Sequence, residues 1–269
     1  MPDEDLELAH RLADVADGIS GSCFDSGAMA VETKVDGTPV TRADREVELA
    51  LRAALARERP HEGFLGEELG SRGPVDRRWI VDGVDGTASF VAGEPEWSTL
   101  IARQVHGEVV VGLVSAPALN RRWHAVRGRG AWTRRRDAVA PEPLTVSATA
   151  DLRAATAAVW PQVAEFPADR LAAAGARVLP EPGTHGRKPS YGSGTCHGAL
   201  LVAEGLVDVF LLTGGGPWDL AALVPIVEEA GGRFSDLSGG RGIEGAAGLF
   251  SNGALHDQVL ELVLDRGVT

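Results

Sequence analysis

The sequence predicts a layered α/β fold with mixed sheets, and three observations support this prediction. Helical and extended patterns interleave along the 269 residues, which argues against an all-helical or all-strand fold. Several extended segments follow one another as hairpins, which a purely parallel sheet does not contain. Hydrophobic residues make up 44% of the chain, enough apolar surface to fill the core of such layers.

The first half of the chain is expected to place two helices before a run of strands. Apolar residues recur at helical spacing over residues 3–19, and residues 42–60 predict a second helix that ends near Pro60. Between them, residues 31–41 are expected to be extended around a glycine-containing turn. The apolar positions of the first helix are Leu6, Leu8, Leu12, Val15 and Ile19.

Strand patterns follow the second helix. "GFLG" predicts a short strand that ends at Glu67 and Glu68, and "RRWIVDGVDGT" predicts a strand that runs into a turn. Residues 99–117 predict a β-hairpin that turns at His106-Gly107, and residues 121–134 predict a further pair of strands. These hairpins are the reason for expecting mixed sheets.

The second half alternates strand and helix patterns. A Pro- and Arg-rich stretch, "TRRRDAVAPEPLTVS", is the expected boundary between two halves, residues 1–140 and 141–269. Pro225 falls inside a predicted helix and should kink it, because proline removes a backbone donor. The patterns in order are "ATAAVW", "DRLAAAGARV", "CHGALLVAEGLVDVFLL", "WDLAALVPIVEEAGGRF" and "HDQVLELVLD".

The composition restricts the cellular setting and the class of partner. With 26 basic and 38 acidic residues, the net charge is -12, which disfavours nucleic acid and anionic membranes as partners. Cys23 and Cys196 are far apart, which argues against a disulfide scaffold or a zinc ribbon. The N-terminal residues resemble no signal peptide, and charged residues interrupt the most apolar segment. We therefore expect a cytoplasmic protein that does not span a membrane.

Acidic residues stand at three places where strands or helices begin or end. They are Glu67-Glu68, Asp82 with Asp85, and Asp219. Each place has an ordinary explanation by itself: a solvated strand end, an Asp-Gly turn, or an acid stabilised by a helix dipole. Strand ends meet at one edge of an α/β sheet, however, and Mg²⁺ prefers oxygen ligands of this kind. The combination therefore favours a metal site.

Gly86-Thr87 directly follows the Asp82 and Asp85 pair. If a helix begins here, its free N–H groups point at an anion such as phosphate, and the Thr87 hydroxyl can orient a water. The alternative is a simple threonine cap on a short helix. The neighbouring acids favour the phosphate site.

Four motifs, in order, resemble those of the inositol monophosphatase superfamily of Mg²⁺-dependent phosphomonoesterases. They are "TPVTRADREVE", "GEELG", "WIVDGVDGTASF" and "WDLAALVPIVEEAGG". The segments "VSAPALNRRWHAVRGRGAW" and "LVAEGLVD" look most like the actinobacterial histidinol-phosphate phosphatases. The resemblance implies a five-layer α-β-α-β-α sandwich, a homodimer, two to three Mg²⁺ ions and a small phosphorylated metabolite as substrate.

The resemblance also implies a set of metal ligands. Glu67, Asp82 and the backbone carbonyl of Val84 would hold one Mg²⁺, and Asp82, Asp85 and Asp219 would hold a second. A third, weaker ion would involve Glu67, which would also help to orient the attacking water. The implied reaction is direct hydrolysis, in which a water activated by Mg²⁺ attacks phosphorus in line.

Further roles follow from the same resemblance. The N–H groups of Gly86 and Thr87 would bind phosphate, and Asp44 with Thr87 would form a dyad that positions the water. Glu68 and Lys34 would contact the metal ligands rather than the metal ions, although a solvated Lys34 is an equal alternative.

The central motif departs from the family pattern at two residues. Gly83 replaces a proline and Ser89 replaces an asparagine. Glycine leaves this turn freer in the unfolded chain, by roughly 0.4–1 kcal/mol, without removing a ligand.

The substrate side departs further. Leu212 aligns with a glutamate that binds inositol hydroxyls, and Thr195 lies nearest to an aspartate typical of histidinol-phosphate phosphatases. Cys196 would be a residue of the pocket wall, and the glycines at 214–216 are expected to be mobile.

The leading hypothesis is a Mg²⁺-dependent phosphomonoesterase, with histidinol phosphate as the first candidate substrate. Because both substrate-side acids are absent, a sugar, nucleoside or inositol-type phosphate of specialised metabolism is the alternative. A catalytically silent binding protein is a more remote alternative, since such proteins usually lose the ligands that this chain keeps. A glycosidase would need two acids on opposite sides of a sugar, and a basic-patch role for residues 134–136 is weaker still.

Overall fold

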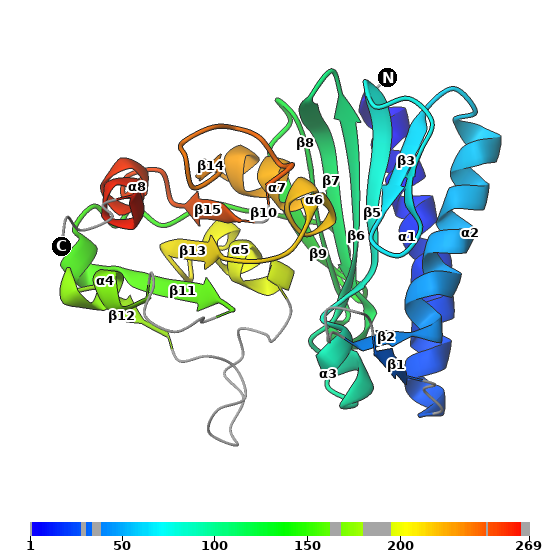
Figure 1. Cartoon of the computed structure of the whole chain (residues 1–269), viewed down its shortest axis with the longest axis horizontal. Coiled ribbons are helices and arrows are strands. Elements are labelled where there is room, and N and C mark those ends of the chain that lie inside the picture. The colour runs from blue at the N-terminus through cyan, green and yellow to red at the C-terminus, as the bar shows by residue number, and fades with distance from the viewer. Residues whose placement is uncertain are drawn as a thin grey trace.

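The structure is a computed structural model that describes residues 2–27, 31–33, 39–161, 168–179, 195–245 and 247–264. It has five layers in the order α-β-α-β-α (Figure 1). Helices α1 and α2 cover an eight-stranded sheet, α5, α6 and α7 lie between the two sheets, and α4 and α8 cover a five-stranded sheet. The predicted fold class is confirmed. The helices are α1 (Pro2–Ser26), α2 (Arg42–Glu58), α3 (Thr87–Val91), α4 (Ala168–Ala173), α5 (Thr195–Ala203), α6 (Pro217–Ala221), α7 (Leu223–Glu229) and α8 (His256–Leu264).

The eight-stranded sheet has the order β10-β9-β8-β7-β6-β5-β3-β4. Its neighbouring strands are antiparallel except for β3 and β5, so the sheet is mixed, as predicted. The expected hairpin joins β6 to β7 through His106 and Gly107, whose φ angles of 52° and 84° suit a two-residue turn. The strands are β3 (Gly63–Gly66), β4 (Gly70–Arg72), β5 (Arg77–Asp85), β6 (Ser98–Val105), β7 (Glu108–Ala116), β8 (Arg121–Val126), β9 (Ala131–Arg135) and β10 (Glu142–Pro143).

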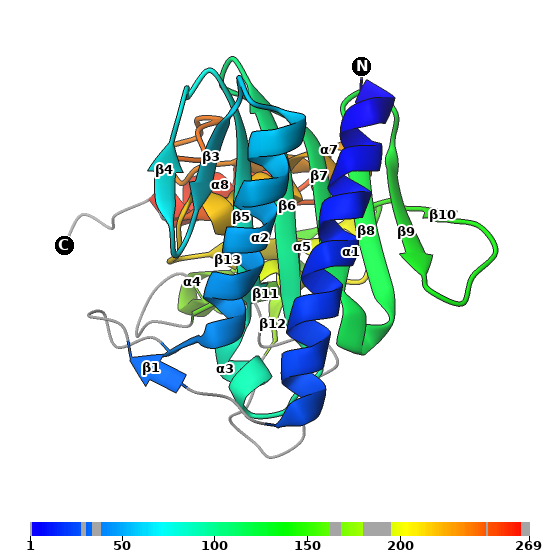
Figure 2. The ribbon, with the colours of Figure 1, turned by 90° about the vertical axis from the view of Figure 1, so that its right-hand side faces the viewer.

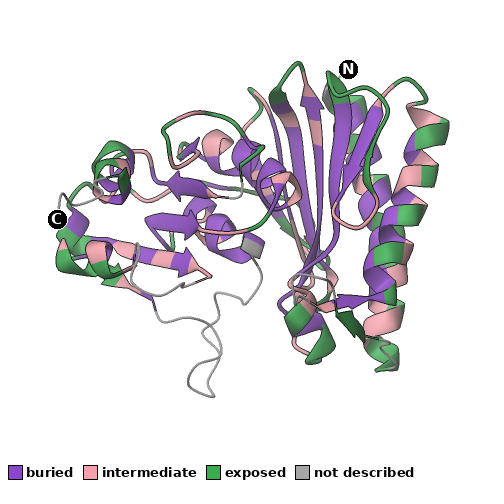
Figure 3. Ribbon diagram, in the orientation of Figure 1, coloured by how far each residue is buried: buried purple, intermediate pink, exposed green. Residues whose placement is uncertain are grey.

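Helices α1 and α2 lie along the outer face of this sheet (Figure 2). Leu8 and Leu12 are fully buried there, as predicted, and pack with apolar residues of α2 and of the central strands. Val15, another apolar position of this helix, is 43% exposed because it lies beside the buried stripe. Figure 3 shows the exposed residues on the outward sides of both helices and the buried ones along the strands. A short pair of strands, β1 (Val31–Thr33) and β2 (Pro39–Thr41), leads into α2.

The five-stranded sheet is also mixed and has the order β12-β11-β13-β15-β14. Its strand β15 forms from "GLFS", a short apolar run among glycines and loop residues that the sequence analysis did not identify. The strands are β11 (Thr156–Trp160), β12 (Arg177–Val178), β13 (Val209–Leu212), β14 (Arg233–Ser235) and β15 (Gly248–Ser251).

The helix that contains Pro225 is interrupted, as predicted. It consists of α6 and α7, which meet at Ala222. A Cβ atom at Gly112 of β7 would lie 2.1 Å from the carbonyl oxygen of Ala222 and 2.7 Å from Cγ of Pro225. Gly112 therefore lets the bent helix pair pack directly on the eight-stranded sheet.

The chain passes from one sheet to the other between Pro143 and Thr156. One apolar cluster joins both sheets through the middle helices, and it includes Leu100 of β6, Leu220 of α6 and Phe210 of β13. The division of the chain at residue 140 stays a prediction. Among the described residues, no helix is both long and apolar enough to cross a membrane.

Candidate active site

Three aspartates from distant parts of the chain meet at the end of β5. Asp82 and Asp85 flank a shift in the register between β5 and β6, and Asp219 lies in the first turn of α6. All three are buried, and one carboxylate oxygen from each lies within 4.8 Å of the others. Glu67 follows β3, which runs parallel to β5 with Gly66 opposite Val81, so the backbone of Glu67 comes level with Asp82.

The electrostatics of this cluster favour a bound cation. Burial raises the pKa of Asp82 well above its ordinary value, and the charges of Glu67 and Asp85 raise it further, followed by those of Asp219 and Asp44. Several buried carboxylates can ionise together only when a positive charge offsets their repulsion. Because all these side chains offer oxygen ligands, the set fits a hard divalent cation such as Mg²⁺.

Asp44 and Thr87 are hydrogen-bonded beside the cluster. The Thr87 hydroxyl donates to Oδ1 of Asp44 at 3.1 Å and also lies 3.0 Å from the carbonyl oxygen of Val84. Asp44 is in the first turn of α2, and its Oδ2 accepts from the backbone N–H of Thr41 at 2.9 Å and from the Thr41 hydroxyl at 2.5 Å. This capping box fixes the carboxylate that accepts the hydrogen bond from Thr87.

The predicted phosphate cradle lies where α3 begins. Gly86 has a φ of 83° and a ψ of 35°, a left-handed conformation that favours glycine, and it caps the helix that begins at Thr87. The N–H of Val84 donates to Oδ1 of Asp82 at 2.9 Å, which holds the turn between the two aspartates. The roles of Gly86 and Thr87 in binding phosphate, and of Val84 as a ligand, stay predictions.

The glycine-rich loop before α6 encloses Asp219. The N–H of Gly216 donates to Oδ2 of Asp219 at 2.6 Å. A Cβ atom at Gly215, whose φ is 132°, would lie 2.6 Å from the same oxygen. The contacts give Gly215 and Gly216 a role in positioning Asp219. The mobility expected of residues 214–216 stays a prediction.

The comparisons with known proteins agree with this geometry. A model of the inositol monophosphatase family matches residues 2–266. This chain belongs to the inositol monophosphatase family. Histidinol-phosphatases from Mycobacterium tuberculosis and Streptomyces coelicolor are 43% and 41% identical to it over 261 and 266 residues. These matches cover 97% of this chain in both cases, and 98% and 97% of the two relatives.

A solved structure supports the same assignment. The inositol monophosphatase of Thermotoga maritima is 30% identical, and the two structures share a TM-score of 0.79 over 98% of this chain and 97% of that one. The predicted family is therefore confirmed, as is the predicted class of enzyme, a phosphoric monoester hydrolase. The family is metal-dependent, and the acidic cluster is consistent with that property.

Glu48 is a residue of this site that the sequence analysis did not single out. Its Oε1 accepts from the N–H of Glu68 and its Oε2 from the N–H of Leu69, both at 3.0 Å. The side chain is fully buried, and a Cβ atom at Gly66 would lie 2.2 Å from Oε2. Glu48 therefore binds the two residues that follow Glu67. The sequence offered one signal for this role, because Glu48 lies four residues after Asp44, on the same side of a helix and within the "TPVTRADREVE" motif.

The structure describes two of the three residues predicted on the substrate side, Cys196 and Leu212, in full. The backbone N–H of Cys196 donates to Oδ2 of Asp85 at 3.0 Å, so the first turn of α5 contacts the acidic cluster. Leu212 is fully buried at the end of β13 and belongs to the apolar cluster between the sheets. The side chain of Thr195 and the whole of Lys34 lie outside the described residues. The substrate-side roles of these residues stay predictions.

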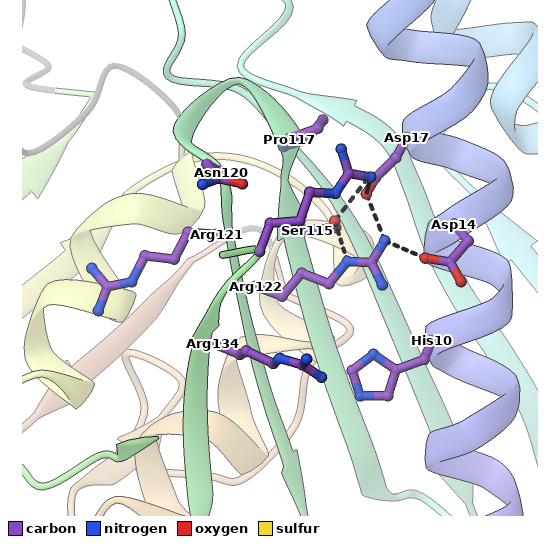
Figure 4. Close-up of a pocket in the computed structure, with 10 residues that line it drawn as sticks. His10, Asp14, Asp17, Ser115, Pro117, Asn120, Arg121, Arg122 and Arg134 are labelled. Atoms are coloured by element: carbon purple, nitrogen blue, oxygen red, sulfur yellow. Dashed lines mark hydrogen bonds and ion pairs between the residues drawn. The ribbon is translucent and has the colours of Figure 1, made fainter. Parts of the chain in front are cut away.

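A pocket of about 230 Å³ lies away from the acidic cluster, between α1 and the strands β7, β8 and β9. Arg122 extends from β8 toward α1, where it donates to Asp14 at 2.7 Å and to Asp17 at 2.6 Å, and also to Ser115 at 2.9 Å (Figure 4). Arg134, from the arginine run noted in the sequence, lines the same pocket. Because Arg122 is already paired with two carboxylates, its main effect is to attach α1 to the sheet.

Proposed function

We propose that this protein is a Mg²⁺-dependent phosphomonoesterase that hydrolyses histidinol phosphate. The observation that carries the proposal is the convergence of Asp82, Asp85 and Asp219 near the Asp44–Thr87 pair. Similarity to two histidinol-phosphatases over nearly the whole chain supports this substrate over other phosphate esters.

The metal ligands would be the residues that the family resemblance implies. Glu67, Asp82 and the carbonyl of Val84 would hold one Mg²⁺, and Asp82, Asp85 and Asp219 a second, with Glu67 near a weaker third ion. Bound Mg²⁺ neutralises the charge of the phosphate and makes an attacking water more acidic. The oxygen donors and the raised pKa of Asp82 support this assignment.

The chain's own residues would position the reactants. A Thr87 hydroxyl that donates its hydrogen bond to Asp44 would have lone pairs available to accept from a water and to orient it toward phosphorus. Asp44 keeps that orientation because Thr41 holds its other oxygen. The N–H groups of Gly86 and Thr87, at the start of α3, would donate to the phosphate oxygens.

Phosphate release from a panel of esters tests the proposal. The panel contains histidinol phosphate, inositol 1-phosphate, a sugar phosphate and a nucleoside monophosphate, each with and without Mg²⁺. We expect the highest kcat/KM for histidinol phosphate, and a loss of about 100-fold or more in Asp82→Asn. Asp76→Asn, an exposed aspartate just before β5, is the matched control and should behave like the wild type.

Each part of the proposal can fail separately. If histidinol phosphate reacts no faster than the other esters, the substrate assignment is wrong. If Asp82→Asn retains full activity, or if activity does not need a divalent cation, the metal mechanism is wrong. The homodimer and the cytoplasmic location belong to the same proposal, and light scattering after size-exclusion chromatography tests the first.

A further inference from the structure

A second group of possible metal ligands adjoins the carboxylate cluster. It consists of Asp85, Cys196 and His197, and one donor atom from each lies within 4.8 Å of the others. Cys196 and His197 are in the first turn of α5, and Asp85 ends β5. All three are buried, with exposed fractions of 3%, 0% and 6%.

The chemistry of these donors differs from that of the carboxylate cluster. Mg²⁺ takes oxygen ligands, whereas a thiolate and an imidazole select softer ions such as Zn²⁺. Sγ of Cys196 lies 3.6 Å from Nδ1 of His197. Tetrahedral Zn²⁺ with ordinary Zn–S and Zn–N bonds separates these two atoms by about 3.6 Å. The observed spacing therefore suits one shared Zn²⁺ ion without a movement of the helix.

The state of His197 supports a ligand role for its ring. Nε2 is buried and has no hydrogen-bond partner among the described residues, and the contact between Nδ1 and Sγ of Cys196 leaves the tautomer open, because either atom can donate. Nδ1, which faces Cys196, can therefore carry the lone pair that binds a metal. The neutral form of an imidazole is the one that binds metals.

We propose that Asp85, Cys196 and His197 form a Zn²⁺ site that shares Asp85 with the carboxylate cluster. Binding forms Zn–S, Zn–N and Zn–O bonds, and the thiol proton of Cys196 leaves to solvent. Since Nε2 of His197 has no orienting partner in the described part of the chain, we expect reversible binding rather than a permanent structural ion. Zn²⁺ bound at this site would occupy Asp85, so that Asp85 could no longer bind Mg²⁺, and hydrolysis would be inhibited. The inhibition rests on the proposed function, whereas the Zn²⁺ binding does not.

Cobalt spectroscopy tests the binding without reference to activity. The full chain, free of Mg²⁺, is titrated with Co²⁺ as a spectroscopic substitute for Zn²⁺, and the near-ultraviolet absorbance is recorded. We expect a thiolate-to-cobalt charge-transfer band that saturates at about one equivalent and disappears when Zn²⁺ is added. Cys196→Ser should lack the band. Cys23→Ser removes the other, partly exposed thiol and should keep it.

The contrary outcomes are distinct. Co²⁺ binding without a charge-transfer band would place the ion on carboxylates alone and overturn the proposal. A band that survives in Cys196→Ser, or that is lost in Cys23→Ser, would overturn it too. His197→Gln, whose side chain keeps a similar length, is a second variant in case Cys196→Ser does not fold, and its Co²⁺ affinity should fall about tenfold or more.

Inhibition is measured separately. At saturating Mg²⁺, the Zn²⁺ concentration that halves phosphate release should rise about tenfold or more in Cys196→Ser and remain unchanged in Cys23→Ser. Equal Zn²⁺ sensitivity in all three proteins would refute the inhibitory role. A protein without phosphatase activity would refute the proposed function alone, because the cobalt titration would still decide the metal site.

Discussion

A Cβ atom at Gly83 would lie 2.6 Å from the carbonyl oxygen of Asp44. The turn between Asp82 and Asp85 therefore lies very close to the first turn of α2. A residue other than glycine at position 83 would not fit between them without a shift of the backbone. The sequence indicated only that glycine loosens this turn relative to the family's proline. The structure adds that Gly83 sets the distance between the turn that carries the proposed metal ligands and Asp44 of the proposed dyad.

Gly83→Ala is therefore expected to displace Asp44. We expect it to lower the free energy of unfolding by about 1–3 kcal/mol, because backbone atoms must move, and to lower kcat/KM by about tenfold or more. Gly21→Ala is the control, since a Cβ atom there meets nothing within 4 Å and alanine favours the helix α1. Chemical denaturation and steady-state kinetics measure both effects. Full activity in Gly83→Ala would show that the contact with Asp44 does not matter.

Glu48→Gln is expected to weaken Mg²⁺ activation. An amide group can accept only one of the two N–H donors that Glu48 binds, so the backbone after Glu67 loses a fixed position. The Mg²⁺ concentration for half-maximal activity should rise about tenfold, and stability should fall by about 1–3 kcal/mol. Glu46→Gln, a partly exposed neighbour on the same helix that pairs with Arg42, should change neither. Unchanged Mg²⁺ activation in Glu48→Gln would argue against a positioning role.

Glu48 should also make stability depend on pH in the absence of divalent ions. Burial raises its pKa from 4.5 to about 7 in the folded protein. Between these two values the unfolded chain releases the proton while the folded chain keeps it, so the free energy of unfolding falls as the pH rises, by at most about 3 kcal/mol. Above pH 7 this contribution is constant. Denaturation at several pH values should give a smaller slope for Glu48→Gln, and identical slopes would contradict the assignment.

Arg122→Ala is expected to destabilise the attachment of α1 to the sheet. The substitution leaves Asp17, whose side chain is only 4% exposed, with Arg136 at 3.7 Å in place of Arg122 at 2.6 Å, which costs about 1–3 kcal/mol. Arg11→Ala on the same helix is the matched control, because its ion pair with Glu58 is largely exposed and contributes less than about 1 kcal/mol. Equal melting temperatures for the two variants would show that Arg122 is not a structural contact.

Much of the fold could be predicted because local patterns determine it. Helix α2 has its N-cap at Thr41 and a run of apolar positions, and the β6–β7 hairpin has a glycine in its turn, so each was visible without tertiary information. Strand β15 and the exposure of Val15 were not predictable in this way. The strand is short and becomes regular only by pairing with β13 and β14, and the buried face of α1 is set by the sheet beneath it.

By itself, the sequence determined the layered α/β class and the order of the acidic motifs, because these depend on residue types and their spacing, and the resemblance of those motifs to a family implied the five layers. Only the tertiary structure decided which groups meet across long distances in the chain. It placed Asp219 against Asp82 and Asp85, Glu48 under the loop after Glu67, and the thiol and imidazole of α5 beside Asp85. The physical reason is that burial and close approach, such as that of Gly83 to Asp44, arise from packing between layers, which no local pattern contains.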